Sequence, residues 1–402
     1  MRLSRDRRLV YAATGLGVGV WSAIIFYGAI ALIPVEHYLV SYYIADYRFG
    51  FIRRGLAGEL VGPVDGPSFF VRAGAMRWTS TAAYLLSLAS VGLMLLRNGC
   101  SERRIMLVLL LPTLSFGVPF AAFSARPDLF GATAVVLLAL SVAARPGWAL
   151  PCSAAYSVVI AGLAFVHEAI PVEFALGAIL AIYLLAEGLS PRRRRWCAAV
   201  AVVPGLAAQT VISMFGRHDV GARLCAIAPH RVVPMMTNFR EFRQQLRTGH
   251  SPTRDYHTWA CRWYLTDYDK SLADAVRHVA HKGVAGLSVS LVLGLVGLAG
   301  CIAAVQYLSG VRFTDFLSGL RDQWAWAAFG LALTIPLFVT AFDWTRWLLV
   351  IAFNTVVVYL LYLRNRPELD EPPPRRTVSA FVMITAAFAV LPLGLIPGGA
   401  TG

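Results

Sequence analysis

The sequence predicts an all-α fold, a polytopic transmembrane bundle of about ten or eleven spans with short interfacial helices in its exported loops. Its composition is the first observation: 57% of the residues are hydrophobic, 14% are charged and the mean hydropathy is +0.63. Soluble domains carry about 25% charged residues, so this chain has too much apolar surface to fold in water. The second observation is that apolar runs of about 18 to 24 residues recur from Ala12 onward, each long enough to cross about 30 Å of hydrocarbon. Helices are the spanning form that such runs support.

The predicted spans follow one another in a single integral membrane domain covering residues 1–402. The first span follows the basic segment MRLSRDRR, and no small-residue cleavage site closes its apolar run, so we expect it to be retained in the protein. The predicted boundaries are 11–34, 79–96, 105–123, 129–144, 149–166, 169–187, 196–214, 284–307, 324–341, 346–363 and 377–397.

Basic residues divide the predicted loops between two sides of the membrane. Arg2, Arg5, Arg7 and Arg8 precede the first span and place the N-terminus in the cytoplasm by the positive-inside rule. Every second loop should then be short and basic. These loops carry Arg97, Arg103 and Arg104; Arg145; Arg192 to Arg195; Arg312 and Arg321; and Arg364, Arg366, Arg375 and Arg376. The pattern predicts a multi-pass protein of the cytoplasmic (inner) membrane.

Two longer loops are predicted on the exported side, over residues 36–77 and 215–283. The second contains NFREFRQQL, in which apolar residues return at helical spacing, so we expect short helices at the interface there. Cys225 and Cys261 both lie in this loop, where oxidation is permitted. A disulfide between them is one interpretation, and two unpaired interfacial cysteines is the other.

The ionisable residues nearest to the membrane gather at turns on the exported side. Charged groups at membrane depth are costly, so each calls for a partner or a function. Four turns meeting at this face would form a polar, arginine-rich cavity that is open to the outside and covered by the 215–283 loop. The candidate residues are Asp46, Arg48, Arg53 and Arg54; Arg126 and Asp128; His167 and Glu168; and Asp343 and Arg346.

These residue types suit transfer from a lipid-linked phosphate donor. A carboxylate can accept the proton of an acceptor hydroxyl; we expect Asp46 to be this base, with Glu168 and Asp343 as alternatives. Arginines bind phosphate oxygens through paired N–H donors. Tyrosines and tryptophans beside them can lie against sugar rings. No metal ion or soluble cofactor is required by these residues.

Each turn also has a purely structural interpretation. Asp343 and Arg346 can pair with each other across a helical turn, and Arg53 with Arg54 can anchor the chain at lipid headgroups. The remaining groups can end or start helices: His167 with Glu168 as a helix end, and Arg126 with Asp128 around the helix-starting Pro127. The formal net charge of +14 is similarly ambiguous, since it suits binding of anionic lipids or phosphates but is common in membrane proteins generally.

Several function classes lack support. The sequence has no Walker loop, no dinucleotide-binding glycine pattern and no GxSxG motif, which argues against nucleotide-driven pumping and serine hydrolysis. Its basic residues are dispersed over membrane loops instead of grouped on a soluble module, which argues against nucleic-acid binding.

The layout resembles that of the GT-C superfamily, multi-span glycosyltransferases that use polyprenyl-phosphate sugars outside the cytoplasmic membrane. In that group an acidic residue shortly after the first span commonly acts as the base, and Asp46 in IADYRFGFIRRG occupies the corresponding place. The resemblance implies that Arg53, Arg54, Arg126 and Arg346 lie near the donor phosphate. It covers topology and no specific motif: the paired acidic motif of the first loop and a large C-terminal exported domain are both missing. The outward arginine-rich loops also resemble those of O-antigen-type polymerases.

The leading hypothesis is a cell-envelope glycosyltransferase or polysaccharide polymerase that takes a polyprenyl-phosphate or polyprenyl-diphosphate sugar at an external cavity, in contact with membrane lipids. A transporter or flippase of a lipid-linked or anionic solute is the first alternative, which predicts inverted repeats and charges near mid-membrane. A non-catalytic membrane subunit, whose long loop binds a partner protein, is the second.

Overall fold

The computed structural model describes residues 4–32, 36–64, 66, 68–236, 239–391 and 393, and it confirms an all-α polytopic bundle. Among the described residues, seven helical segments are long and apolar enough to cross a membrane, and three shorter apolar helices accompany them. The bundle helices are α1 (Arg5–Tyr27), α4 (Phe69–Leu96), α5 (Glu102–Leu110), α6 (Val118–Phe123), α7 (Asp128–Ala144), α8 (Ala149–Val166), α9 (Ile170–Leu185), α10 (Pro191–Phe215), α15 (Gly283–Ser309), α17 (Trp324–Ala332), α18 (Ile335–Thr340), α19 (Trp344–Leu363) and α20 (Arg375–Val390).

The predicted spans coincide with helices, apart from three differences. The second span begins at Phe69 and not at residue 79, so Arg77 lies inside α4. The third span, 105–123, is not helical at residues 114–117, between η4 (Leu111–Thr113) and α6. The span predicted over 324–341 is divided into α17 and α18. Pro336 explains the division, because proline has no N–H for a helical hydrogen bond and its ring clashes with the preceding turn. Residues 33–34 of the first predicted span, and 392 and 394–397 of the last, lie outside the described residues.

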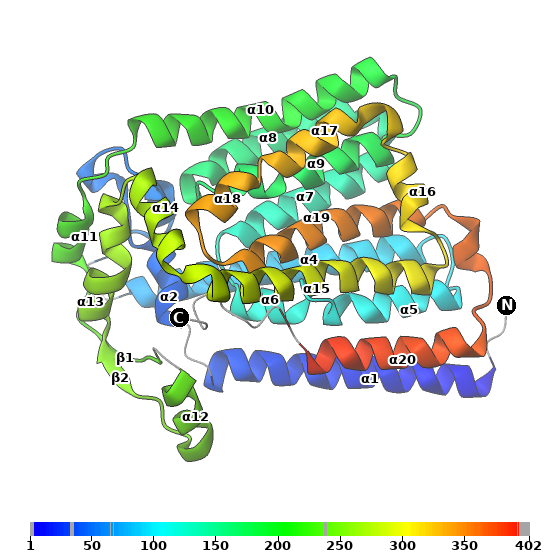
Figure 1. Cartoon of the computed structure of the whole chain (residues 1–402), viewed down its shortest axis with the longest axis horizontal. Coiled ribbons are helices and arrows are strands. Elements are labelled where there is room, and N and C mark those ends of the chain that lie inside the picture. Colours follow the sequence, from blue (N-terminus) through cyan, green and yellow to red (C-terminus); the bar gives the residue numbers. More distant parts are fainter. Residues whose placement is uncertain are drawn as a thin grey trace.

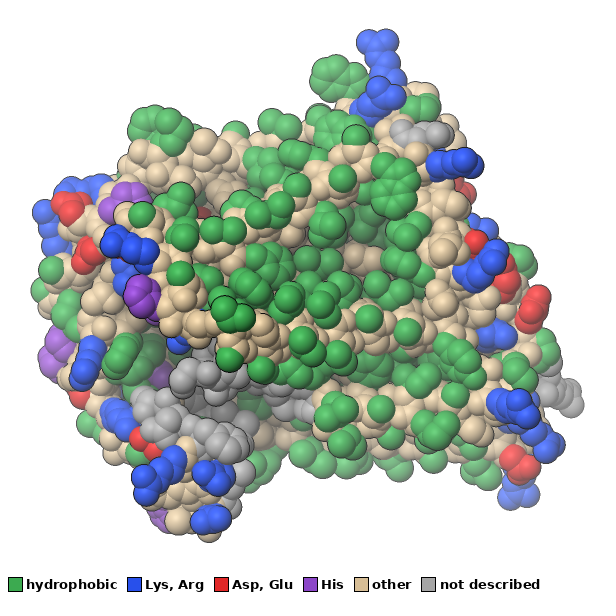
Figure 2. All heavy atoms as spheres, viewed as in Figure 1, with side chains coloured by type: hydrophobic (Ala, Val, Ile, Leu, Met, Phe, Trp, Pro, Cys, Tyr) green, Lys and Arg blue, Asp and Glu red, His purple; other side chains and the backbone are tan. Residues whose placement is uncertain are grey.

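The polar residues separate to the two ends of the bundle. Figure 1 shows the start of α1 and the α9–α10 and α19–α20 connections at one end, with α2 (Glu36–Val40), α11 (Gly221–Ile227) and α14 (Leu272–His281) at the other. In Figure 2 the Lys and Arg side chains cluster at these ends, and hydrophobic side chains cover the surface between them. This is the pattern of a protein that spans a bilayer with its helix axes across it. We call the end with α2 and α11 the loop end.

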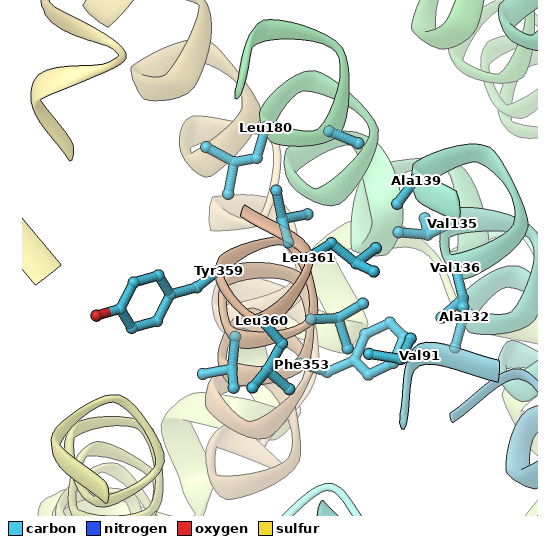
Figure 3. Close-up of a cluster of buried hydrophobic side chains, with 14 of the residues drawn as sticks. Val91, Ala132, Val135, Val136, Ala139, Leu180, Phe353, Tyr359, Leu360 and Leu361 are labelled. Atoms are coloured by element: carbon cyan, nitrogen blue, oxygen red, sulfur yellow. The ribbon is translucent and has the colours of Figure 1, made fainter. Parts of the chain in front are cut away.

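The centre of the bundle is formed by α9 and α19. Every residue of α9 and most residues of α19 are buried, as expected for helices enclosed by other helices. Figure 3 shows Phe353, Leu360 and Leu361 of α19 packed toward Val135 of α7 and Leu180 of α9. The first turns of α9 and α19 both lie at the loop end, so this core fixes the positions of the residues that begin them.

The two loops predicted to be exported are folded into short elements at the loop end. The first contains α2, the 3₁₀ helices η2 (Ser41–Tyr43) and η3 (Tyr47–Phe49), and α3 (Gly55–Val61). The second contains a helix over the predicted NFREFRQQL segment, α12, and a disulfide that joins Cys225 to Cys261. Its elements are α11, β1 (Val232–Pro234), α12 (Phe239–Thr248), β2 (Thr253–Asp255), α13 (Tyr256–Trp259), the π-helix η6 (Ala260–Tyr264), η7 (Leu265–Asp269) and α14. The antiparallel β1–β2 pair was not expected from the sequence.

The close approach of α15 to α19 generates a prediction about stability. A side chain at Gly294 would place its Cβ 2.8 Å from Cβ of Leu348 and 3.0 Å from Cα of Thr345, whereas a Cβ at Gly19 of α1 would meet no atom within 4 Å. We expect Gly294→Val to destabilise the protein by about 1–3 kcal/mol through overpacking, and Gly19→Val to leave it nearly unchanged. Thermal unfolding in detergent measures both. Equal midpoints for the two variants would show that this helix contact does not require glycine.

Candidate functional site

Crossed ion pairs join two of the predicted turns at the loop end. The Asp128 carboxylate, in the first turn of α7, accepts a hydrogen bond from Arg346 in the first turn of α19. In the same two turns, Nη2 of Arg126 lies 3.9 Å from Oδ2 of Asp343, the residue that precedes α19. Asp343 and Arg346 therefore each face a partner from the other turn. All four side chains are at most 15% exposed.

Glu173 places a further carboxylate beside these pairs. It lies in the first turn of α9, is fully buried, and has its Oε1 3.7 Å from Nη2 of Arg346. Within the described part of the chain, neither of its carboxylate oxygens has a hydrogen-bond partner. Arg346 thus lies between Asp128 and Glu173, where its charge offsets the cost of removing two acidic groups from water.

A bidentate ion pair joins the other two turns. Arg54 donates from Nε and Nη2 to the two carboxylate oxygens of Glu168, with both distances 2.8 Å. Arg53 lies beside the pair, with Nη1 3.6 Å from Glu168. Paired N–H donors on one carboxylate are the strongest arginine geometry, and they fix the direction of the guanidinium plane.

The backbone at Arg54 is unusual. Its φ of 62° is the only positive φ of a non-glycine residue in the described ranges. The left-handed region costs an ordinary residue about 1–2 kcal/mol, and surrounding contacts must hold it there. Here the contacts are the Glu168 pair and the hydroxyl of Tyr264, which accepts a hydrogen bond of 3.1 Å from Nη1 of Arg54. The chain is thus strained where it directs this arginine toward the turn after α8.

Tyr42 connects the two halves of this arrangement. Its ring centre is 5.2 Å from the guanidinium carbon of Arg54 and 5.6 Å from that of Arg126. The His167 ring packs 5.4 Å from the same ring. We call the connected set the arginine cluster; it consists of Tyr42, Arg53, Arg54, Arg126, Asp128, His167, Glu168, Glu173, Asp343 and Arg346.

The long loop between α10 and α15 covers one side of the arginine cluster. Besides Tyr264, this loop contributes the backbone oxygen of Asp267, which accepts a hydrogen bond from Arg53. The ring of Tyr268 lies 5.1 Å below the guanidinium of Arg53. The site is therefore buried on the membrane side, at Glu173 and Asp128, and partly exposed at Arg53, Arg54 and Glu168.

Asp46 makes its hydrogen bonds within its own turn. Its carboxylate caps η3 by accepting the backbone N–H of Arg48, and it also accepts from Nε of Arg48 at 2.8 and 3.0 Å. Asp46 is 6% exposed. These contacts stabilise the turn at η3, and the role of Asp46 as a base stays a prediction.

Burial and neighbouring arginines leave His167 and Glu168, the two residues after α8, in different charge states. Burial alone would raise the pKa of Glu168, but the charge and hydrogen bonds of Arg54 and the charge of Arg53 hold that pKa well below its ordinary value. Burial lowers the pKa of His167 to about 3, and the charge of Arg54 acts in the same direction. At neutral pH Glu168 is therefore ionised and His167 is neutral.

Side chains that are placed to share a metal ion lie outside the arginine cluster. The described groups of His, Cys and carboxylate side chains that are close enough to share an ion lie in the long loop, around His257, and not in the arginine cluster. The chemistry that the arginine cluster offers is anion binding by guanidinium groups and proton transfer by carboxylates.

Comparison with known proteins places the chain in a family. Residues 11–389 match the family described as "Uncharacterised membrane protein Rv1490". The chain belongs to this Rv1490 family. An uncharacterized protein of Mycobacterium tuberculosis strain H37Rv, Rv1490, is 36% identical over 400 residues, which cover 98% of this chain and 92% of that protein. An uncharacterized protein of Mycobacterium bovis, Mb1527, matches with the same identity and coverage. No solved structure matches the chain.

Two components of the site in this Rv1490-family protein were missed in the sequence. Glu173 stands in the predicted span 169–187, where an acidic residue in an apolar run is itself a signal of function or of a buried partner. Tyr264 could not be found in this way, because the long loop has many aromatic residues and only the folded chain selects the one beside Arg54.

The low pKa of His167 predicts how the stability of this Rv1490-family protein depends on pH. The unfolded chain binds a proton at His167 below pH 6.5 and the folded chain only near pH 3, so stability falls as the pH drops from 6.5. At pH 5 the loss is about 2 kcal/mol. Glu168 adds nothing to this loss, because its contribution is retained above its unfolded pKa of 4.5.

The measurement is the difference in unfolding midpoint between pH 7 and pH 5, in detergent. We expect His167→Gln to reduce this difference, and His250→Gln, at an exposed residue of the long loop, to preserve it. If wild type and His167→Gln lose equal stability between the two pH values, His167 is not the neutral buried group described here.

Proposed function

We propose that this membrane protein is a cell-envelope glycosyltransferase or polysaccharide polymerase, and that it takes a polyprenyl-phosphate-linked sugar at the arginine cluster. One observation carries the proposal: guanidinium and carboxylate groups from four separate turns are contiguous at one end of an apolar bundle. A lipid-linked donor presents its phosphate at this depth while its hydrocarbon chain stays in the bilayer.

Arg126 is the arginine best suited to receive a phosphate. In the described part of the chain its guanidinium makes no hydrogen bond, and its contacts are the Asp343 carboxylate at 3.9 Å and the faces of Tyr38 and Tyr42. Arg54 is already held by both oxygens of Glu168, so it contributes positive charge more than free donors. Arg53, at the exposed edge, adds a second guanidinium.

Asp343 is the carboxylate that we assign as the base. It adjoins Arg126 and is 15% exposed, so an acceptor hydroxyl can reach it from the open side. Glu168 is a weaker candidate, because the arginines that lower its pKa also lower its affinity for a proton. Asp46, with both oxygens bonded to Arg48, is the third candidate.

The proposed step is a displacement at the anomeric carbon of the donor sugar. The acceptor oxygen forms a bond to that carbon as the bond from carbon to phosphate oxygen breaks. Asp343 accepts the hydroxyl proton, and Arg126 with Arg53 stabilises the charge left on the departing polyprenyl phosphate or diphosphate. Atoms and charge balance without a metal ion or a redox partner.

Transport of a lipid-linked or anionic solute is the second candidate function. The buried Glu173 and Asp128 favour it, because acidic groups in spanning helices often bind protons or cargo. The one-ended distribution of the arginine cluster favours transfer at a single face instead, since alternating access requires a site near the middle of the membrane.

The test is transfer of sugar from polyprenyl-phosphate monosaccharides by the purified full chain in lipid nanodiscs. We expect Asp343→Asn to lower the transfer rate by about 10²–10⁴-fold through loss of the base. Arg126→Gln should lower it by about 10²–10³-fold through loss of phosphate stabilisation, and it should also weaken binding of polyprenyl phosphate without sugar.

The matched control is Asp315→Asn. Asp315 pairs with Arg312 at 3.6 Å, and both are exposed on the connection between α15 and α17, at the end of the bundle opposite the arginine cluster. Transfer by this variant should equal that of wild type. Transfer that survives both Asp343→Asn and Arg126→Gln contradicts the proposal, and phosphate-lipid uptake without any transfer supports the transport alternative.

A further inference from the structure

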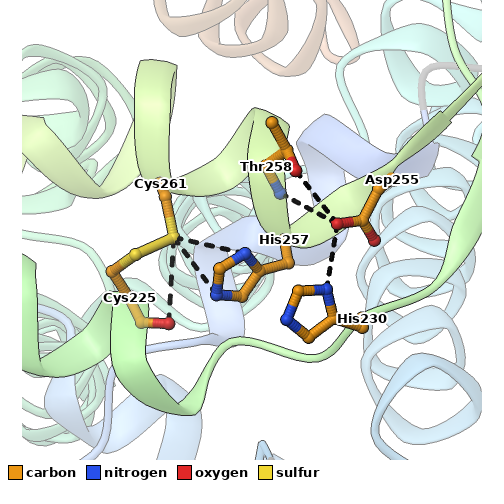
Figure 4. The surroundings of a disulfide bond; sticks show 6 residues. All are labelled: Cys225, His230, Asp255, His257, Thr258 and Cys261. Carbon is orange, nitrogen blue, oxygen red and sulfur yellow. Dashed lines mark hydrogen bonds and ion pairs between the residues drawn. A yellow bond between two sulfur atoms is a disulfide. The ribbon is translucent and has the colours of Figure 1, made fainter.

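A second group of polar side chains lies in the long loop, outside the arginine cluster. His230, Asp255 and His257 each offer a ligand atom, and these atoms lie within 4.8 Å of one another. Nδ1 of His230 is 3.0 Å from Oδ2 of Asp255, and the His230 and His257 rings stack with centroids 3.9 Å apart. Figure 4 shows the three residues beside the Cys225–Cys261 disulfide.

The fold holds these residues together by two cross-links. Upstream of His230, the disulfide ties Cys225 in α11 to Cys261 in η6. Downstream, β1 pairs with β2 so that Val232 lies opposite Asp255. The segment that carries His230 is thus fixed at both ends against the segment that carries the other two residues. Such preorganisation reduces the entropy that a ligand must remove on binding.

We propose that His230, Asp255 and His257 bind a divalent transition-metal ion, with Zn²⁺ as the leading candidate, on the exterior of the long loop. Two imidazoles and one carboxylate are a ligand set that suits Zn²⁺, Cu²⁺ and Ni²⁺ and is poor for Mg²⁺ or Ca²⁺. This site is independent of the proposed transferase activity. No group of the arginine cluster takes part in it.

The distances suit a zinc ion after a small movement. Ligand atoms at about 2.1 Å from a tetrahedral ion are about 3.4 Å apart. The His230–Asp255 separation of 3.0 Å is already near that value, and His257 has to approach by rotation of its ring. His230 has a side chain that is 73% exposed, so an ion can enter from solvent and retain water as its fourth ligand.

Hydrogen bonds orient the central carboxylate. Oδ1 of Asp255 accepts the backbone N–H of Arg231 at 3.1 Å, and Oδ2 accepts the hydroxyl of Thr258 at 3.0 Å. Carboxylate ligands held by such outer contacts bind metals more tightly than mobile ones. A bound ion would take the place of the hydrogen bond between His230 and Asp255.

The sulfur atoms do not belong to this ligand set in the oxidised protein. Sγ of Cys261 is 3.7 Å from Nε2 of His257, but a disulfide sulfur is not a thiolate and is a poor metal ligand. The expected coordination is therefore by nitrogen and oxygen alone. Cobalt can report this difference, since thiolate ligands give an intense charge-transfer band and imidazole or carboxylate ligands do not.

The experiment is Zn²⁺ titration of the full chain in nanodiscs, purified without a histidine tag or reductant. Free thiols are first blocked with N-ethylmaleimide, because Cys100 is exposed. We expect one saturable Zn²⁺ per chain and a Co²⁺ form without a thiolate band. His230→Gln and His257→Gln should each weaken binding by at least about tenfold, the lower limit seen even for outer-sphere changes.

Two further variants separate metal binding from folding. Asp255→Asn retains an oxygen that can cap α13, so it should weaken Zn²⁺ binding while the loop stays folded. His250→Gln removes an exposed histidine of the same loop, one bonded to the backbone oxygen of Thr248, and should leave binding unchanged. The proposal is overturned if wild type shows no saturable equivalent, or if His230→Gln, His257→Gln and Asp255→Asn all retain wild-type affinity.

Discussion

The pairing of Arg346 with Asp128 is the interaction on which the loop end depends. Both side chains are almost fully buried, and they stand in the first turns of α7 and α19. A buried charge that loses its partner costs about 3–5 kcal/mol, so α7 and α19 are held in register by the requirement that these groups meet. That register also brings Arg126 within reach of Asp343. Packing of the apolar core sets the position of each helix along the bundle, and the ion pair sets the rotation of α7 and α19 about their own axes.

The arginine cluster changes character from its buried side to its exposed side. On the buried side, the Arg346 guanidinium is paired with the carboxylates of Glu173 and Asp128. At Arg53 and Arg54, guanidinium groups outnumber Glu168 and reach solvent. In the inner part, positive and negative groups are therefore paired. The outer part has excess positive charge and N–H donors. An anion approaching from the loop end meets the outer part first, and the positive φ of Arg54 places this arginine there at some cost in stability.

The sequence allowed most of the helices, their order and the turns that meet at one end of the bundle to be predicted, because apolar length and arginine placement are local properties. It also identified the pairs His167–Glu168 and Asp343–Arg346 as positions of interest. Their partners could not be predicted: spacing suggested that Asp343 pairs with Arg346, whereas each faces residues 126 or 128 in a turn more than two hundred residues away. Helix rotation decides such contacts, and an apolar helix such as α9 carries almost no sequence signal of its rotation. The division of α17 from α18 was missed for another reason, since Pro336 is tolerated within many membrane helices.

The long loop links the two proposed sites at the loop end. His257 in α13 and Tyr264 in η6 belong to consecutive helical turns, and η6 also carries Cys261 of the disulfide. Tyr264 is the residue through which this loop contacts Arg54. Any event that shifts α13, whether a bound ion at His257 or opening of the disulfide, acts on a short and stiff segment whose other end touches the arginine cluster. Coupling of this kind requires a difference in contacts between two states, and the hydrogen bond from Arg54 to Tyr264 is the contact that can supply it.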